Sequence, residues 1–143
     1  MKKITVLASM LILGSILPGL KADECSSADL RGDYSFVVSG TLNGSPFAAT
    51  GETIYNGDGT AEGVIQASVG GTVYPPAPWT AKYSLSLMTA GGGQTVCVLN
   101  KTITIPDYGM QVSFFGSAGD NFKELRFIAT TPGSTISGTA RKQ

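Results

Sequence analysis

The sequence predicts an all-β fold, an eight-stranded antiparallel barrel of the up-and-down (meander) type. Beyond residue 22 the chain consists of short runs that alternate apolar and polar residues, and no window of ten or more residues shows helical period. Turn sequences separate the runs. Asn56-Gly57-Asp58-Gly59 is the strongest, because Asn and Gly tolerate the positive φ angles of a tight hairpin turn. Closure into a barrel is the commonest way for a meander to hide its edge strands, and a two-sheet β-sandwich is the alternative.

Eight segments have the alternation expected of strands. In the first, Tyr34, Phe36 and Val38 alternate with polar residues, so one face is expected to pack inward and the other to meet water. In the second, Gly51 stands in mid-strand, which indicates a bulge or a sharp bend. The expected strands span residues 31–39, 47–55, 60–69, 79–88, 95–105, 110–115, 123–130 and 134–141.

Two places depart from plain alternation. Residues 74–78 contain three prolines, which lack the donor that a sheet ladder needs, so this segment is expected to be a stiff loop outside the strands. In the fifth strand the apolar positions change parity, from Val96 and Val98 to Leu99, Ile103 and Ile105. That change predicts a bulge near Leu99 or Asn100.

The first residues have the layout of a secretory signal peptide rather than of a fold. Two lysines follow Met1, an apolar stretch runs over residues 4–20, and Ala22 offers a cleavage site before the acidic Asp23 and Glu24. A retained membrane anchor is the alternative, which Pro18 and the short apolar core disfavour. We therefore expect residues 1–22 to be removed, leaving residues 23–143 as a single domain that is secreted or periplasmic in a bacterium, without stable membrane insertion.

The charge balance argues against a nucleic-acid partner. Ten basic and ten acidic residues balance in the full chain, and Lys2, Lys3 and Lys21 leave with the predicted signal peptide. The mature chain is then acidic, so it offers no basic surface for phosphates.

Cys25 and Cys97 both lie in the exported part and are expected to pair, because disulfides persist in oxidising compartments. The bridge would close a loop of about 73 residues and contribute roughly 4 kcal/mol on the chain-entropy account. Two unpaired buried thiols are the alternative. A metal site is not predicted, since the chain has no histidine and no third cysteine.

No catalytic residue is predicted. Without histidine, Ser–His and Cys–His arrangements are excluded. Most acidic residues fall at turns or on predicted solvent faces, where a carboxylate normally only solubilises the chain. No cofactor is predicted. These residue types favour a protein without enzymatic activity, and an enzyme is left as an open alternative.

Aromatic side chains form the one plausible ligand-facing set. In a closed eight-stranded barrel, inward residues either fill the interior or line a pocket for one small ligand, and a filled core is the alternative here. Arg126 is a candidate anchor for an acidic head group, or else it pairs with a neighbouring carboxylate. Residues 74–78 are the expected lid. The predicted ligand-binding residues are Trp79 and Tyr83 as walls, with Tyr34, Phe36, Tyr55 and Arg126.

Several short motifs are spread along the chain: Leu-Arg-Gly-Asp-Tyr-Ser-Phe at 30–36, Gly51, Asn-Gly-Asp-Gly at 56–59, Gly63, Lys-Glu-Leu-Arg-Phe-Ile at 123–128 and Gly-Thr-Ala-Arg at 138–141. Together they resemble a group of secreted bacterial proteins of unknown function. Their expected architecture is similar to that of lipocalins, avidins and allene oxide cyclases, the calycin-like barrels. The calycin Gly-x-Trp is Gly-x-Tyr here, at Tyr34, and the avidin biotin-contacting pattern has no counterpart. The resemblance implies a barrel and does not carry over a ligand.

Three function classes follow. The first is binding of a small, largely apolar molecule in the barrel mouth. The second is a non-enzymatic interaction module at the cell surface, with a protein partner. The third is a cyclase or isomerase in which a shaped pocket does most of the work.

Overall fold

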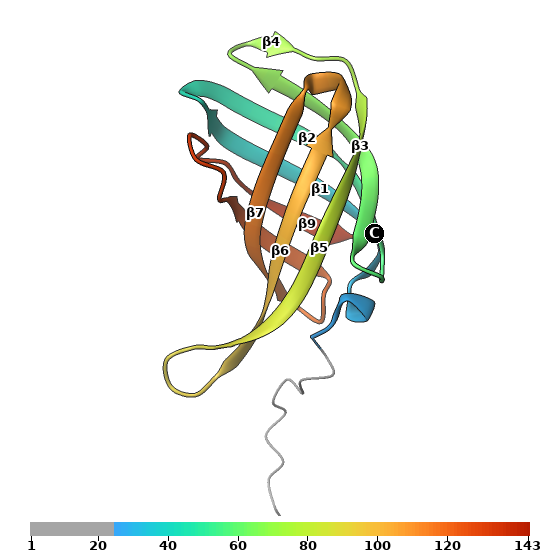
Figure 1. Ribbon diagram of the computed structural model, residues 1–143, viewed down its shortest axis with the longest axis vertical. Coiled ribbons are helices and arrows are strands. Elements are labelled where there is room, and N and C mark those ends of the chain that lie inside the picture. The colour runs from blue at the N-terminus through green and yellow to red at the C-terminus, as the bar shows by residue number, and fades with distance from the viewer. Residues whose placement is uncertain (1–24) are drawn as a thin grey trace, which may run out of the picture.

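The computed structural model describes residues 25–143, so the predicted signal peptide lies outside the described residues. Most of the described chain is in strands, which wrap around one axis (Figure 1). No described helix is long and apolar enough to cross a membrane. In chain order the elements are the short 3-10 helix η2 (Ser27–Asp29), β1 (Arg31–Leu42), β2 (Ser45–Asn56), β3 (Thr60–Val69), β4 (Thr72–Val73), β5 (Ala77–Thr89), β6 (Thr95–Ile105), the 3-10 helix η3 (Pro106–Tyr108), β7 (Met110–Gly119), β8 (Glu124–Ala129) and β9 (Ser137–Lys142).

The sheet closes on itself. Its strand order is β2-β1-β9-β8-β7-β6-β5-β3, and an additional pairing of β2 with β3 joins the two ends. All pairs are antiparallel, and β4 is a two-residue addition beside β3. The eight-stranded up-and-down barrel is therefore confirmed, and the sandwich alternative is wrong. One boundary also needs correction: Pro78 belongs to β5 and pairs with Val64 near the end of the β3–β5 ladder, where one missing donor is tolerated.

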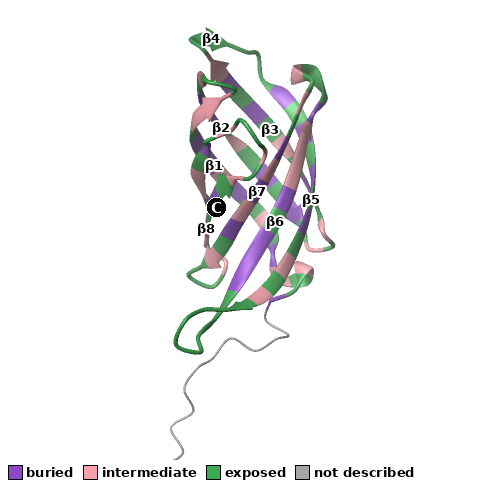
Figure 2. Cartoon of the chain, turned by 60° about the vertical axis from the view of Figure 1, so that its left-hand side comes forward, coloured by how far each residue is buried: buried purple, intermediate pink, exposed green. Residues whose placement is uncertain are grey.

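Buried and exposed residues alternate along the strands, as a barrel with one inward face requires (Figure 2). The ladder runs through Gly51 without a bulge, from Phe36 on β1 to Ile65 on β3. A Cβ on Gly51 would lie 2.0 Å from the carbonyl oxygen of Val64 and 3.0 Å from the Phe36 ring. Gly51 is thus a point of close approach between strands, over which an aromatic ring packs.

Gly63 repeats this arrangement on β3. A Cβ there would lie 1.9 Å from the carbonyl oxygen of Glu52 and 2.7 Å from the ring of Trp79. The missing side chains let β2 and β3 coil tightly against each other where the barrel closes, and they make room for the Trp79 ring inside it.

The expected bulge in the fifth strand is absent. β6 pairs with β5 and β7 in continuous register through Leu99 and Asn100. The inward face therefore keeps one parity, and Lys101 and Ile103 follow Leu99 on it. Val98, which suggested the parity change, is buried although it lies on the opposite face of the strand.

One end of the barrel is closed by the segment before β1. Cys25 is disulfide-bonded to Cys97 at the start of β6, with the two Cα atoms 5.6 Å apart, which confirms the predicted pairing. Leu30 is completely buried, and η2 lies at the end of the barrel opposite β4 (Figure 1). The disulfide thus holds the closing segment against the barrel.

We expect Gly63→Ala to lower the free energy of unfolding by about 1–3 kcal/mol, because the new methyl group has no space between the Glu52 carbonyl and the Trp79 ring. The measurement is urea unfolding followed by tryptophan fluorescence. Gly119→Ala is the control, since a Cβ at Gly119 meets nothing within 4 Å and its change is expected to stay within about 0.5 kcal/mol. Equal effects of the two substitutions would contradict the close-approach account of Gly63.

Candidate functional site

A layer of three tyrosines closes the η2 end of the interior. The rings of Tyr34 and Tyr83 each meet the ring of Tyr55 edge-on, with 5.2 Å between centroids in both pairs. The Tyr83 hydroxyl lies 2.8 Å from the carbonyl oxygen of Leu30 and accepts a hydrogen bond from the backbone N–H of Gly57. The Tyr34 hydroxyl donates to the carbonyl of Phe122. Burial raises the pKa of Tyr34 to about 12 and raises that of Tyr55 further, so this layer is uncharged.

Above this layer lies a buried lysine. Lys101 on β6 is only 5% exposed, and its Nζ donates a hydrogen bond of 2.9 Å to the hydroxyl of Tyr55. Four aromatic rings surround the amine, with their centroids 5.1–6.0 Å from Nζ: those of Tyr55, Trp79, Phe114 and Phe127. The ion pair found among the described residues joins Arg126 to Glu124, so no carboxylate neutralises Lys101 there.

This environment changes the protonation of the amine. Burial lowers the pKa of Lys101 from its ordinary 10.5 to about 7. The aromatic rings attract a cation, but each such contact contributes only about 0.5–2 kcal/mol, which does not offset the loss of hydration. Near neutral pH the side chain is therefore present both as ammonium and as neutral amine.

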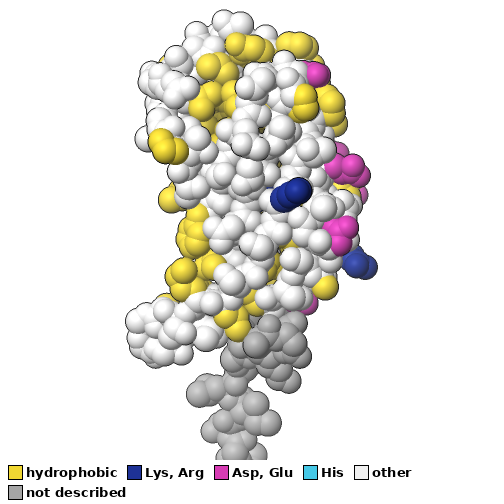
Figure 3. Space-filling view, viewed as in Figure 1, with side chains coloured by type: hydrophobic (Ala, Val, Ile, Leu, Met, Phe, Trp, Pro, Cys, Tyr) yellow, Lys and Arg dark blue, Asp and Glu magenta, His cyan; other side chains and the backbone are white. Residues whose placement is uncertain are grey.

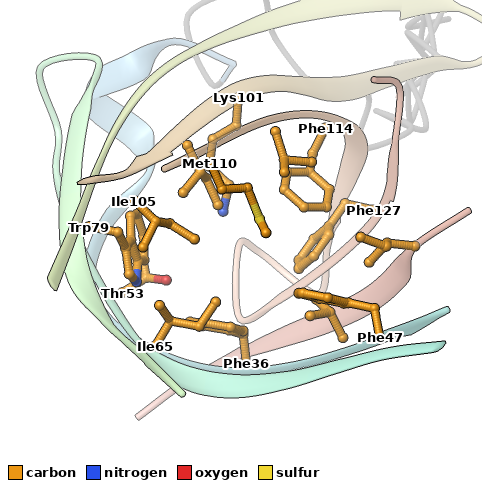
Figure 4. Close-up of a pocket in the computed structure, with 14 residues that line it drawn as sticks. Phe36, Phe47, Thr53, Ile65, Trp79, Lys101, Ile105, Met110, Phe114 and Phe127 are labelled. Carbon is orange, nitrogen blue, oxygen red and sulfur yellow. The ribbon is translucent and has the colours of Figure 1, made fainter. Parts of the chain in front are cut away.

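The Lys101 amine faces a cavity of about 30 Å³ in the middle of the barrel (Figure 4). That is room for about two water molecules, far below the roughly 300–1,000 Å³ of a typical small-molecule pocket. Most of the interior is thus filled by side chains. The apolar members of the wall are Phe36, Val38, Phe47, Ile65, Ile103, Ile105, Met110, Val112, Phe114, Phe127 and Ile136.

The polar members of the same wall are Lys101, Thr53 and Trp79. Thr53 Oγ1 and Trp79 Nε1 are both buried without a hydrogen-bond partner among the described residues, and the two side chains lie next to each other (Figure 4). An indole N–H only donates, and so does an ammonium. The cavity therefore presents hydrogen-bond donors that pair with no described residue, and none of the acidic side chains between residues 25 and 143 lines it.

The opposite end of the cavity lies under the turn between β6 and β7. Met110, which is half-buried, follows η3 and lines the cavity there. The ring of Tyr108 in η3 packs against that of Tyr74 at a tilt of 55°, with 5.2 Å between centroids, and the Tyr108 hydroxyl donates to the carbonyl of Pro75 over 2.7 Å. The proline-rich loop that the sequence predicts as a lid is therefore fastened to this end. Hydrophobic side chains also gather near β4 on the surface (Figure 3).

The six predicted ligand-binding residues fall in three places. Phe36 and Trp79 line the cavity. Tyr34, Tyr55 and Tyr83 form the closing layer, and the Tyr55 hydroxyl accepts the hydrogen bond from Lys101. Arg126 lies on the outside, with its side chain 75% exposed and its Nε 3.0 Å from Glu124 Oε1.

Sequence reasoning missed Lys101 and Thr53. The available signal was parity: Lys101 stands between Leu99 and Ile103 on one face of a strand. A lysine is so rarely buried that this position reads as an exposed interruption of the pattern.

Comparison with known proteins supports the fold alone. No protein-family model matches the chain, and no curated protein matches it. Among solved structures, a redesigned β-barrel is similar with a TM-score of 0.51 and 18% identity, over 83% of this chain and 96% of that one. At that identity the match supports a small β-barrel and shows no family, and the resemblance to calycin-like proteins stays a prediction.

Between about pH 7.5 and about pH 9.5, we expect the free energy of unfolding of the wild-type protein to rise by about 2 kcal/mol relative to that of Lys101→Met. In this window the unfolded lysine still binds a proton, whereas the native one, with a pKa of about 7, has largely lost it. Folding therefore releases a proton, and the free-energy cost of that release falls as the pH rises. Higher pH is avoided because unfolded tyrosines ionise near about pH 10.

The measurement is urea unfolding of both proteins across that pH range. Lys82→Met, on the exposed face of β5, serves as the control and is expected to run parallel to the wild type. Parallel profiles for the wild type and Lys101→Met would show that the buried amine does not change its proton affinity on folding.

Proposed function

We propose that this protein is a secreted or periplasmic barrel that binds a small, largely apolar molecule carrying a carboxylate. The observation that supports it is the set of buried donors on the cavity wall. Within the described part of the chain, Lys101 has no carboxylate partner, and Thr53 Oγ1 and Trp79 Nε1 have no hydrogen-bond partner. A carboxylate offers acceptor oxygens to all three and supplies the missing counter-charge. In this proposal Lys101, inside the barrel, binds the carboxylate head group in place of Arg126, which lies on the surface.

The remaining wall fits an apolar body. Aromatic and aliphatic side chains extend from the Lys101 amine towards the β6–β7 turn, and the tyrosine layer blocks the other end. A ligand longer than a few non-hydrogen atoms needs more space than the present cavity. Met110 is the side chain suited to yield it, because methionine is unbranched and adapts its shape at small cost.

A second candidate is the cell-surface interaction module. Val37 on β1 and Ile128 on β8 are 58% and 55% exposed, and both strands pair with β9 between them. Phe115 is the register partner of Ile128 and continues this outward apolar surface onto β7. Such a surface suits a protein partner. Unlike the cavity wall, its residues Val37, Phe115 and Ile128 include none of the unpaired buried polar groups of the described chain.

We expect hexanoate to bind the wild-type protein more tightly than its neutral analogue methyl hexanoate, and at least about tenfold more tightly at pH 6 than at pH 8.5. The reason is that the lysine is charged below its pKa of about 7 and neutral above it. Isothermal titration calorimetry measures both affinities.

Lys101→Met is expected to abolish the preference for the carboxylate, whereas Lys82→Met leaves it unchanged. Propionate extends the series to a ligand that fits with less movement of Met110. The proposal is wrong if neither acid binds, or if Lys101→Met binds hexanoate as well as the wild type does.

A further inference from the structure

We infer that Lys101 is also a covalent capture site for small aldehydes, which it takes up as an imine inside the barrel. The inference uses the same cavity as the proposed function but the other protonation state of the lysine. It therefore concerns a different class of ligand, and it can fail while carboxylate binding stands.

The first support is the position of the nucleophile. Nζ of Lys101 faces the cavity and is enclosed by four aromatic rings, and its one hydrogen-bond partner among residues 25–143 is the neutral hydroxyl of Tyr55. Neither an acidic side chain on the cavity wall nor an ion pair in the described chain holds the lysine as ammonium. A lysine desolvated in this way is available as a free amine, which is the form that attacks a carbonyl.

The second support is the placement of groups that the reaction needs. The amine adds to the carbonyl carbon with formation of a C–N bond, and the proton it loses moves to the carbonyl oxygen, giving a carbinolamine. Loss of water from the carbinolamine then gives the imine, so one aldehyde is consumed and one water is released. The Tyr55 hydroxyl, 2.9 Å from Nζ, is placed to relay this proton: it accepts one from the amine while donating its own to the carbonyl oxygen, so the neutral phenol is regenerated.

The same wall also offers donors to the oxygen. Thr53 Oγ1 and Trp79 Nε1 have no other partner among the described residues and lie on the cavity wall beside the space the carbonyl would occupy. Donors of this kind stabilise the negative charge that develops on the oxygen during addition. Once formed, an imine in this space is shielded from bulk water by apolar side chains.

The size of the cavity sets the class of aldehyde. About 30 Å³ accommodates only a few non-hydrogen atoms beside Nζ, so short aliphatic aldehydes are the expected reactants. The apolar wall disfavours sugars and other polyhydroxylated carbonyl compounds, whose hydroxyls would be buried without partners.

The test is reductive trapping of the folded protein with propanal and sodium cyanoborohydride, followed by peptide mapping with mass spectrometry. We expect Lys101 to be propylated at least about tenfold faster than the exposed Lys82, Lys123 and Lys142 at pH 7.5, where only about one in a thousand ordinary lysines is neutral. Peptide mapping also separates this product from modification of the α-amino group.

Two further readouts distinguish the proposed site from accidental reactivity. The rate at Lys101 is expected to rise between pH 6 and pH 8, the opposite of the trend for hexanoate, and propionate is expected to protect Lys101 at pH 6.5. Tyr55→Phe, which keeps the ring and removes the hydroxyl, is expected to slow trapping at Lys101 without changing the rate at Lys82.

The inference is overturned if Lys101 reacts no faster than Lys82. It is equally overturned if Lys101 reacts only in step with global unfolding as urea is added, since the folded cavity would then play no part. Either result, combined with pH-dependent binding of hexanoate, would leave the carboxylate proposal intact and remove the covalent one.

Discussion

Closure of the sheet between β2 and β3 is the constraint on which the rest of the structure depends. The pairing from Phe47–Val69 to Tyr55–Ala61 turns an open meander into a closed barrel. It is possible because Gly51 and Gly63 let the two backbones approach to distances that a Cβ would forbid. The rings that cover these glycines, Phe36 and Trp79, are also part of the cavity wall. Closure and cavity are therefore built by the same residues.

A closed barrel also fixes the electrostatics of its interior. Ten to thirteen residues in most strands give a long interior whose η2 end is sealed by Leu30 and the tyrosine layer. A charge inside it is removed from water without compensation by an opposite charge. Such desolvation shifts the pKa of buried lysines by several units, whereas the cation–π contacts recover only part of the loss. The lysine consequently changes its protonation state near neutral pH.

The architecture could be predicted from the sequence because it depends on local patterns of residues. Alternation, turn residues and the two cysteines identified the strands, their order and the disulfide, and each of these signals involves residues close to one another or a single pair. The site depends instead on exceptions to those patterns. Pattern alone does not reveal Lys101, because lysine is usually exposed. The predicted anchor Arg126 lies outside, as its alternation with Leu125 and Phe127 indicates. Buried Val98 likewise suggested a bulge that the continuous ladder excludes.

The polar groups of the cavity are not explained by folding alone. Leu99 and Ile103 on either side of Lys101 show that apolar residues fit this face of β6. Leaving a buried donor unpaired costs about 1–3 kcal/mol, and replacing buried polar groups by apolar ones of similar shape is often neutral or stabilising. A methionine at position 101 and a valine at position 53 would fill the same space without that cost. The chain instead carries a lysine, a threonine hydroxyl and an indole N–H around one small cavity, at the expense of stability. That combination is what a site for a polar head group requires, and it is the physical reason to look for the ligand inside the barrel rather than on its surface.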